Sequence, residues 1–439
     1  MTETASDLAP AVAADPNSPA FVKAVTQLGQ SRPVVSREAI YNQQGVKLLE
    51  GGVQIDAKLY DRLVSHRLAA PLDESIDTDA PITSAQLRQA CEAAMASRPF
   101  FALMGPPGRM RSMLLQSIEA IALPQPVAFH LTLARETRPA LFEHSILMAI
   151  LCAHLVREGG APVYDMTVAA TAGLLHDLGM LHVDAQTLDS GVRLSGDDRR
   201  PLYAHPVTSS MLIARFQAYP KQVARAIVEH HERLDGSGYP RGLVGDAISP
   251  LGRLLSLCEV VTAMFDGGRK HPEQRVSLLL RVSPRRFDAA LVPSIHRLLR
   301  ALPADPNDVE GALTDLVDRL RELANLLNQW HVAAADSALQ VDAAAQAVLK
   351  AVADQAETLQ RMLFEAGITP DQLGLLMLGS EPDAQVRGEL WALARELHWQ
   401  LCASANQLRH RWRASARGQA FPPAVAAWLD AIEALEAPA

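Results

Sequence analysis

The chain has 439 residues, of which 49% are hydrophobic and 5% aromatic, and its formal net charge is −8 at pH 7. This length exceeds one compact core, so we expect two or three domains, and the wealth of Ala and Leu favours helix over sheet. The negative charge argues against broad attraction to a nucleic acid polymer or to an anionic membrane.

The termini and the cysteines indicate a cytoplasmic protein. Its four cysteines are scattered without a Cys-x-x-Cys pair, which favours reduced thiols over a disulfide framework. The N-terminus lacks the charged start and apolar run of a signal peptide, and no uninterrupted apolar stretch reaches about 18 residues. We therefore expect no membrane span.

The N-terminal part of the chain predicts two regions. Residues 1–30 are rich in Ala, Pro, Asp and Ser, and we expect a flexible lead-in. Residues 31–123 predict a small α+β accessory region. Within it, two short apolar runs in 39–49 flank a polar turn that ends at Gly45, which is typical of a β-hairpin.

Helices are expected to follow this hairpin. Asp56 and Ser84 are candidate helix caps, and a further helix is expected over about 107–122. The sequence Leu123-Pro124-Gln125-Pro126 predicts a domain boundary. Residues 127–300 then show helical patterns joined by Gly- and Pro-bearing loops.

Residues 305–439 predict a C-terminal helical bundle. Long Ala- and Leu-rich helices are expected over about 308–330, 336–365 and 383–412. The last of them carries an apolar stripe of Leu390, Leu393, Leu397, Leu401 and Leu408. This stripe indicates either a bundle core or an interface, with a second copy of the chain or with a signalling partner protein.

Histidines and acidic residues between 144 and 259 form the most informative pattern. His144 shares a helix face with apolar residues three, four and seven positions later, so it should be buried. Asp165 is a candidate cap for a helix that ends in the adjacent pair His176-Asp177. A carboxylate at the end of an apolar helix is costly to bury unless a cation or a strong donor compensates.

More residues of the same kind follow. His205-Pro206 is expected to open a helix, and the neighbours His230 and His231 should project about 100° apart on another. Glu259 stands in an apolar helical pattern over 253–264. Imidazole and carboxylate together suit divalent iron, manganese or zinc.

So many ligands exceed the need of one ion. Two ions about 3.5–4 Å apart, with Asp177 as the natural bridge, can activate water and stabilise the departing oxygen of a phosphate. The pattern therefore predicts hydrolysis of a phosphoester.

Two motifs carry a family resemblance. His176-Asp177 resembles the defining pair of the HD phosphohydrolase superfamily, and the segment from His230 to Pro240, HHERLDGSGYP, resembles the signature of its HD-GYP subfamily. Later residues agree in type and order, among them Ile248-Ser249-Pro250. The resemblance covers about 130–300.

The resemblance implies an all-α HD-GYP helical domain. Together with the patterns of the flanking regions, it leads us to expect a mainly α protein in which this domain stands between the small α+β region and the C-terminal bundle. It implies hydrolysis of cyclic di-GMP to pGpG or GMP with two divalent ions, iron or manganese first and zinc or magnesium as alternatives. The implied metal ligands are His144, His176, Asp177, His205, His230, His231 and Glu259, with Asp177 and His176 catalytic.

The loop after the paired histidines is the implied substrate lip. Gly238 permits a tight turn and Pro240 fixes φ. Tyr239 either contacts a guanine or locks the loop over the core. Arg241 and Arg269 are candidates for phosphate contacts.

The sequence departs from the family pattern at four positions. Met180 stands where the family has a lysine expected to meet a substrate phosphate, and a second lysine is replaced near Ser190. Glu259 replaces an Asp, and Ala140 stands where some members carry an extra Glu, which favours two ions over three. Three interpretations stay open: a cyclic di-GMP phosphodiesterase, a degenerate module that binds cyclic di-GMP or a partner protein without turnover, and a phosphohydrolase for another nucleotide.

Overall fold

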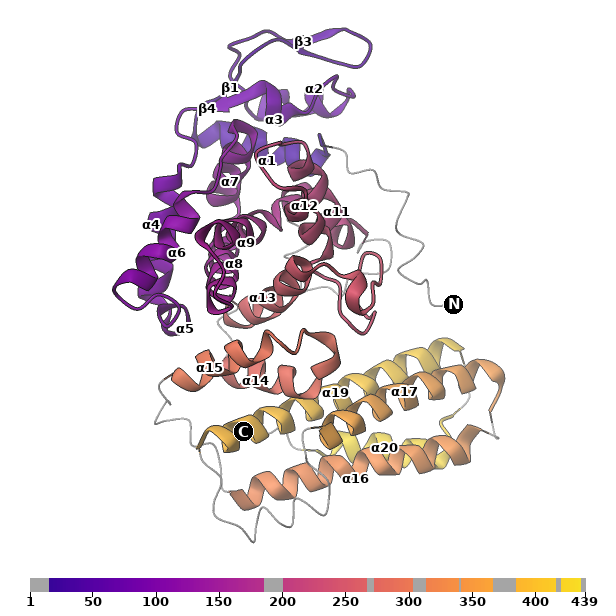
Figure 1. The fold of residues 1–439 in the computed structure, drawn as a ribbon. Coiled ribbons are helices and arrows are strands. Elements are labelled where there is room, and N and C mark those ends of the chain that lie inside the picture. The colour runs from indigo at the N-terminus through magenta and orange to yellow at the C-terminus, as the bar shows by residue number, and fades with distance from the viewer. Residues whose placement is uncertain are drawn as a thin grey trace. The chain divides into compact units, whose positions relative to one another are not determined.

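The computed structural model describes residues 16–184, 200–266, 272–302, 313–338, 341–365, 384–415 and 420–435. The fold is mainly α, as predicted (Figure 1). The chain forms two compact units. The first comprises Met1–Arg269 and Arg285–Leu302, and the second comprises Lys270–Pro284 and Pro303–Ala439.

The first unit begins with helix α1 (Pro19–Ser31) and two antiparallel pairs of strands. The flexible lead-in expected over 1–30 is thus wrong for residues 19–30, because Phe21, Val22 and Leu28 of α1 are buried in the core. The strands are β1 (Val34–Ser36), β2 (Ile40–Tyr41), β3 (Lys47–Leu49) and β4 (Ile76–Thr78), and they pair as β1 with β4 and β2 with β3. The predicted hairpin is confirmed by the β2–β3 pair. Gly45 in its turn has a φ of +76°, a conformation that glycine adopts without steric cost.

Short helices complete the α+β region. They are η2 (Ala57–Leu59), α2 (Tyr60–Val64), α3 (Leu72–Ser75), α4 (Ser84–Ser97), α5 (Pro99–Ala102) and α6 (Arg109–Glu119). Asp56 caps η2 as predicted, because its carboxylate accepts from the Lys58 amide at 2.9 Å. The cap predicted at Ser84 is wrong by one residue. Thr83 caps α4, since its hydroxyl and the Gln86 side chain form a reciprocal capping box.

A further series of helices completes the first unit. They are α7 (Gln125–Thr137), α8 (Pro139–Glu158), α9 (Val163–Leu175), η3 (Leu178–His182), α11 (Arg200–Ala214), α12 (Lys221–Glu229), η5 (Gly245–Ala247), α13 (Pro250–Asp266), η6 (Pro284–Arg286) and α15 (Val292–Ala301). Helices α8 and α9 run side by side (Figure 1). Gly173 permits this approach, because a Cβ there would lie 2.8 Å from the Met148 carbonyl oxygen. Helix α6 packs on both, so the predicted boundary at 123–126 lies inside one unit.

Helix α8 is long and apolar enough to cross a membrane by length and composition alone. However, 67% of its most apolar window is buried inside the structure. Its neighbours α7, α9 and α13 supply that cover. The helix therefore has the surroundings of a core helix.

Three local predictions near the histidines are wrong. Asp165 lies in the first turn of α9, whose N-cap is Pro162. Pro206 lies inside α11 and does not open it. His230 is the C-cap residue of α12, so His230 and His231 follow the helix and do not lie on it. In each case the sequence pattern locates the element but misplaces its end, because capping depends on backbone contacts.

The second unit is a helical bundle with its own apolar core. Its helices are α14 (Pro272–Val282), α16 (Leu313–Ala338), α17 (Ala343–Glu365), α19 (Ala384–Ser415) and α20 (Pro423–Glu433). The leucine stripe predicted on α19 is buried in this core, with Trp330 and Trp428 among its other members. Helix α14, predicted within 127–300, packs against α17 and α19 of the second unit.

Candidate metal centre

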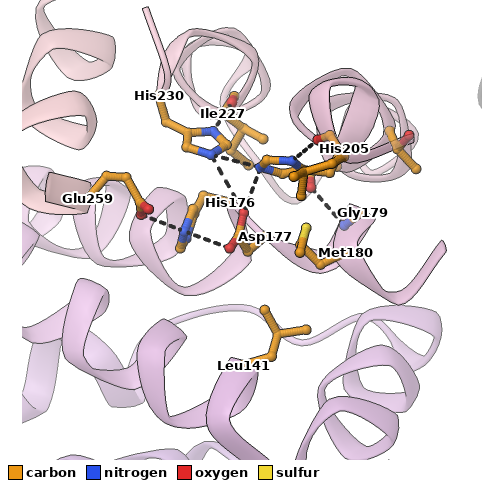
Figure 2. Close-up of polar contacts among 12 residues, drawn as sticks. Leu141, His176, Asp177, Gly179, Met180, His205, Ile227, His230 and Glu259 are labelled. Carbon is orange, nitrogen blue, oxygen red and sulfur yellow. Dashed lines mark hydrogen bonds and ion pairs between the residues drawn. The ribbon is translucent and has the colours of Figure 1, made fainter. Parts of the chain in front are cut away.

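Five of the predicted site residues meet where α9, α11, α12 and α13 approach one another. Figure 2 shows His176, Asp177, His205, His230 and Glu259 directed toward a common point. His176 and His230 are fully buried, His205 is 3% exposed, and the Asp177 and Glu259 side chains are each 14% exposed. The helices thus bring residues that are 83 positions apart in sequence into one cluster.

Free backbone carbonyls orient three of these histidines. The Nδ1 atom of His176 lies 2.7 Å from the Gly173 carbonyl oxygen, and that of His230 lies 2.6 Å from the Ile227 oxygen. Both acceptors belong to the last turn of a helix, where carbonyls lack a partner within the helix. Because Nδ1 donates to these oxygens, the lone pair of each ring is on Nε2, which faces the cluster.

His205 obtains the same orientation from inside a helix. Its Nδ1 lies 2.5 Å from the Leu202 carbonyl oxygen. In a regular helix that oxygen would accept from the amide of residue 206, but residue 206 is proline and has no N–H. The sequence His205-Pro206 therefore frees the acceptor that orients the imidazole.

The inward-facing atoms lie within reach of one another. Asp177 Oδ1 is 3.0 Å from His205 Nε2 and 3.5 Å from His230 Nε2, and the two Nε2 atoms are 3.2 Å apart. Glu259 Oε2 lies 3.2 Å from His176 Nε2. Two imidazole lone pairs that face each other at such a distance repel unless a proton or a cation lies between them.

His144 on α8 closes the cluster on the other side. Its Nε2 lies 3.0 Å from Glu259 Oε2, while its Nδ1 forms a hydrogen bond with the Asp266 carboxylate. Glu259 thus contacts both His144 and His176, so its longer side chain does reach the cluster. Asp266 was not predicted. It stands seven residues after Glu259, two turns along the same helix face, and that spacing was the available signal.

The charges of these residues depend on one another. Burial would raise the pKa of Asp177, but His176 and His205 outweigh it and hold the pKa well below its ordinary value. Burial likewise opposes the shift at Glu259, where His144 and His176 keep the pKa well below the usual range. Burial and then His230 hold the pKa of His231 well below 6.5, so that its ring is neutral at pH 7 and can act as a ligand.

The donor set fits divalent cations. Three groups each place their ligand atoms within 4.8 Å of one another: His205, His230 and His231; His144, His176 and Glu259; and His176, Asp177 and His230. Within the described part of the chain, His176 Nε2 and Asp177 Oδ1 are buried without a hydrogen bond of good geometry. Buried polar atoms of this kind are costly unless something satisfies them. A cation would satisfy both.

The loop after the paired histidines packs against the cluster. The Tyr239 ring stacks on His231 with centroids 4.6 Å apart and meets the Tyr203 ring edge-on at 4.7 Å. The Tyr239–Pro240 peptide bond is cis. A Cβ on Gly238 would lie 2.4 Å from the Arg233 amide nitrogen, so no other residue fits there without displacing backbone. Tyr239 therefore locks the loop through its contact with His231. The contact of Tyr239 with a guanine stays a prediction.

Two fully buried carboxylates hold this loop. Glu232 accepts from the backbone amides of Arg241 at 2.8 Å and Leu243 at 2.9 Å. Glu229 accepts from the Ser249 amide at 2.9 Å and also pairs with the Arg241 guanidinium at 3.2 Å. The Arg241 side chain is thus engaged with Glu229, which limits its use for a phosphate. The sequence analysis assigned no role to either glutamate.

The other predicted substrate contacts are less defined. Arg269 and Ser190 lie outside the described residues. Met180 is in η3, where its carbonyl oxygen lies 2.5 Å from an Arg138 guanidinium nitrogen, and its thioether carries no charge toward the cluster (Figure 2). The lysine of the family pattern is therefore replaced at position 180 by an uncharged side chain.

The comparisons agree with this geometry. Residues 130–291 match the family model described as HD domain. The chain is 36% identical over 123 residues to 3′3′-cGAMP-specific phosphodiesterase 1 of Vibrio cholerae serotype O1, a match that covers 28% of each protein. It is 32% identical over 157 residues to 3′3′-cGAMP-specific phosphodiesterase 3 of the same organism, covering 36% of this chain and 34% of the relative.

A third relative has a different substrate in its name. The chain is 30% identical over 152 residues to a cyclic di-GMP phosphodiesterase of Pseudomonas aeruginosa, covering 34% of this chain and 37% of the relative. The chain therefore matches only about a third of the length of these curated relatives. The segment that matches the HD domain model, residues 130–291, contains the histidine and carboxylate cluster.

Proposed function

We propose, on the premise that residues 130–291 form an HD domain of the HD-GYP type, that this protein is a metal-dependent phosphodiesterase acting on a cyclic dinucleotide. The substrate that we propose first is cyclic di-GMP, hydrolysed to pGpG or GMP. The observation that carries the proposal is the convergence of imidazole Nε2 atoms and carboxylates on one point, with two buried atoms left unsatisfied.

The cofactor that we propose is a pair of divalent ions, iron or manganese first, with zinc and magnesium as alternatives. The chemistry they supply when bound is activation of water and neutralisation of phosphate charge. His205, His230 and His231 would hold one ion, and His144, His176 and Glu259 would hold the other. Asp177 lies between the two groups and would bridge them.

The residues of this chain have separate tasks in such a reaction. Asp177 would orient the attacking water, while His176 and the other histidines would hold the ions. The three backbone carbonyls that accept Nδ1–H keep each Nε2 directed inward, so the site is arranged before the substrate arrives. The loop held by Glu229 and Glu232 presents Tyr239 beside His231, where it can exclude water from the phosphodiester.

A second function is favoured by two observations at the predicted phosphate contacts. Met180 supplies no charge where a cation would meet a substrate phosphate, and the Arg241 guanidinium is engaged with Glu229. Weak phosphate contacts would lower turnover without preventing metal binding. In that case the domain would bind a cyclic dinucleotide or a partner protein as a signalling module. The part of the C-terminal bundle in such a partnership, or in a homodimer, stays a prediction.

The deciding experiment uses the full chain purified without oxygen and loaded with iron or manganese. Turnover of cyclic di-GMP, 3′3′-cGAMP and a linear nucleotide ester is measured while bound metal is counted on the same sample. About two ions per chain with turnover of a cyclic dinucleotide would support the phosphodiesterase, and the preferred substrate would assign its specificity.

Full metal loading without turnover of any of these substrates would support the signalling module. The variant Met180→Lys then separates the two cases. If the missing charge is the defect, the lysine should restore measurable turnover. If the chain binds no metal, both functions based on this centre are wrong.

A further inference from the structure

His144 is oriented differently from His176, His205 and His230, three other histidines of the centre. The Nδ1 atoms of His176, His205 and His230 each meet the carbonyl oxygen three residues earlier in their own chain segment. The Nδ1 atom of His144 instead meets a carboxylate from another helix, that of Asp266 at the end of α13. One of the four rings therefore depends on a partner 122 residues away.

The position of His144 in α8 explains this difference. His176 and His230 end helices and His205 precedes a proline, so each has a free carbonyl nearby. His144 lies well inside α8, where carbonyls accept from amides four residues later. The carbonyl three residues before it, that of Leu141, also accepts from the Ser145 hydroxyl at 3.0 Å. No backbone acceptor is left for the imidazole.

We propose that Asp266 is the positioning residue that makes His144 a metal ligand. Its carboxylate accepts from Nδ1–H and fixes the ring so that Nε2 lies 3.0 Å from Glu259 Oε2, which leaves Nε2 as the atom that would bind a metal. This arrangement is a carboxylate–histidine–metal triad, in which the outer carboxylate fixes the ring and raises its basicity. The inference rests on the metal centre of the proposed function and assigns the device that completes its His144 side.

Arg98 holds the Asp266 carboxylate from the far side. Its Nη1 lies 3.8 Å from Asp266 Oδ1 and donates to the neighbouring Phe265 carbonyl oxygen at 3.2 Å, while its Nη2 pairs with Glu143. Asp266 Oδ1 therefore faces a cation, and Oδ2 is left for His144. Arg98 and its contacts belong to the first unit, so the line from Arg98 to Glu259 lies within one compact body.

The test measures Mn²⁺ affinity of the full chain by competition with a chromophoric chelator, together with the number of Mn²⁺ ions bound. Asp266→Asn replaces the charged acceptor of Nδ1–H by a neutral amide oxygen, which is a weaker acceptor. We expect the affinity for one of the two ions to fall about 10- to 100-fold. Asp266→Glu should recover part of that loss. Circular dichroism and the melting temperature of each variant verify folding.

Glu143→Gln is the matched control. It removes a carboxylate that also pairs with Arg98 and is adjacent to His144 in sequence, but it does not contact the His144 ring. Its Mn²⁺ affinity should stay within about 2-fold of the wild type, because surface ion pairs contribute little. A loss there equal to that of Asp266→Asn would overturn the proposal.

A double-mutant cycle shows whether Asp266 acts through His144. In the His144→Ala background, Asp266→Asn should cause no further loss of Mn²⁺ affinity, because the ring it positions is gone. An undiminished loss in that background, or wild-type affinity in Asp266→Asn, would overturn the positioning role. A wild type that binds two Mn²⁺ ions without turnover would contradict the proposed phosphodiesterase, yet the dissociation constants would still decide the role of Asp266. A wild type that binds none would overturn both.

Discussion

The interior of the first unit contains, within a mostly apolar core, a polar cluster that sets it apart from the bundle core of the second unit. In the first unit, helices α9, α11, α12 and α13 enclose histidines and carboxylates, of which His176 and His230 are fully buried. In the second unit, α16, α17 and α19 enclose mostly Leu, Ala and Val side chains and several Trp rings. Among the residues that the structure describes, both interiors contain buried polar atoms without a hydrogen bond of good geometry, but their chemistry differs. In the first unit they include His176 Nε2 and Asp177 Oδ1, which can bind a cation, whereas in the second they include the indole N–H groups of Trp330 and Trp391, which cannot.

This difference leads us to expect that the polar cluster serves ligand binding and that the apolar bundle core serves stability. A buried polar group costs free energy unless it is paired, so a fold that keeps several of them incurs a cost that an apolar core avoids. The second unit shows that this chain can build an apolar helical core. The polar cluster of the first unit is therefore best explained by a ligand that it holds, and the following predictions test the contrast between this cluster and the bundle core.

The largest effect is expected at Asp177. Asp177→Ala removes the carboxylate between the two groups of ligand atoms, and we expect turnover to fall on the order of 10³-fold with loss of bound metal. Turnover and metal content are measured on the same sample. Asp165→Ala, an exposed carboxylate in the first turn of α9, is the control and should change neither quantity. Unchanged turnover in Asp177→Ala would contradict the mechanism.

The second unit should respond only in stability. Trp330 is fully buried with its ring 4.4 Å from that of Trp428, so Trp330→Ala should lower the free energy of unfolding by about 3–5 kcal/mol. Chemical denaturation measures the loss, and metal content should stay at the wild-type value. Trp399 is 59% exposed on α19, and Trp399→Ala should cost less than about 0.5 kcal/mol. Equal losses in both variants would argue against the core assignment.

Metal removal should lower the stability of the first unit and leave the stability of the second unchanged. At a metal concentration 100 times the dissociation constant, binding adds about 2.7 kcal/mol to the native state. Hydrogen exchange should therefore quicken in α9 and α12 after chelation and stay unchanged in α16 and α19. A uniform change across both units would indicate that the polar cluster is not where the metal binds.

The smallest effect is expected at Pro206. Pro206→Ala restores an amide that competes with His205 for the Leu202 carbonyl oxygen, so metal affinity should fall about 5-fold. The same change removes a helix-interior proline and should raise the stability of α11, by up to about 3 kcal/mol. Metal titration and denaturation measure the two quantities. A stabilised variant with unchanged metal affinity would show that the proline does not serve His205.

The sequence determined the class of fold and the members of the cluster. Helical patterns located the long helices of the bundle, but α1 lies in the segment that was expected to be flexible, and no helix was expected at the position of α20. The leucine stripe of α19 is buried, as one of its two interpretations required. The pair His176-Asp177 and the ordered segment from His230 to Pro240 pointed to the HD domain that the family model matches. A motif of adjacent residues can be recognised in the sequence without knowledge of the fold. Glu259 was indicated by its apolar surroundings and by the place of a further carboxylate in the family pattern.

Only the tertiary structure decided how these residues are oriented. The acceptor for each Nδ1 depends on where a helix ends, and the sequence placed the ends around Pro206 and His230 wrongly. Asp266 shares a helix face with Glu259, but its contact with His144, 122 residues away, could be seen only once α13 lay against α8. Side-chain types are written in the sequence, but the direction of a lone pair follows from which backbone and side-chain acceptors the packed helices leave free.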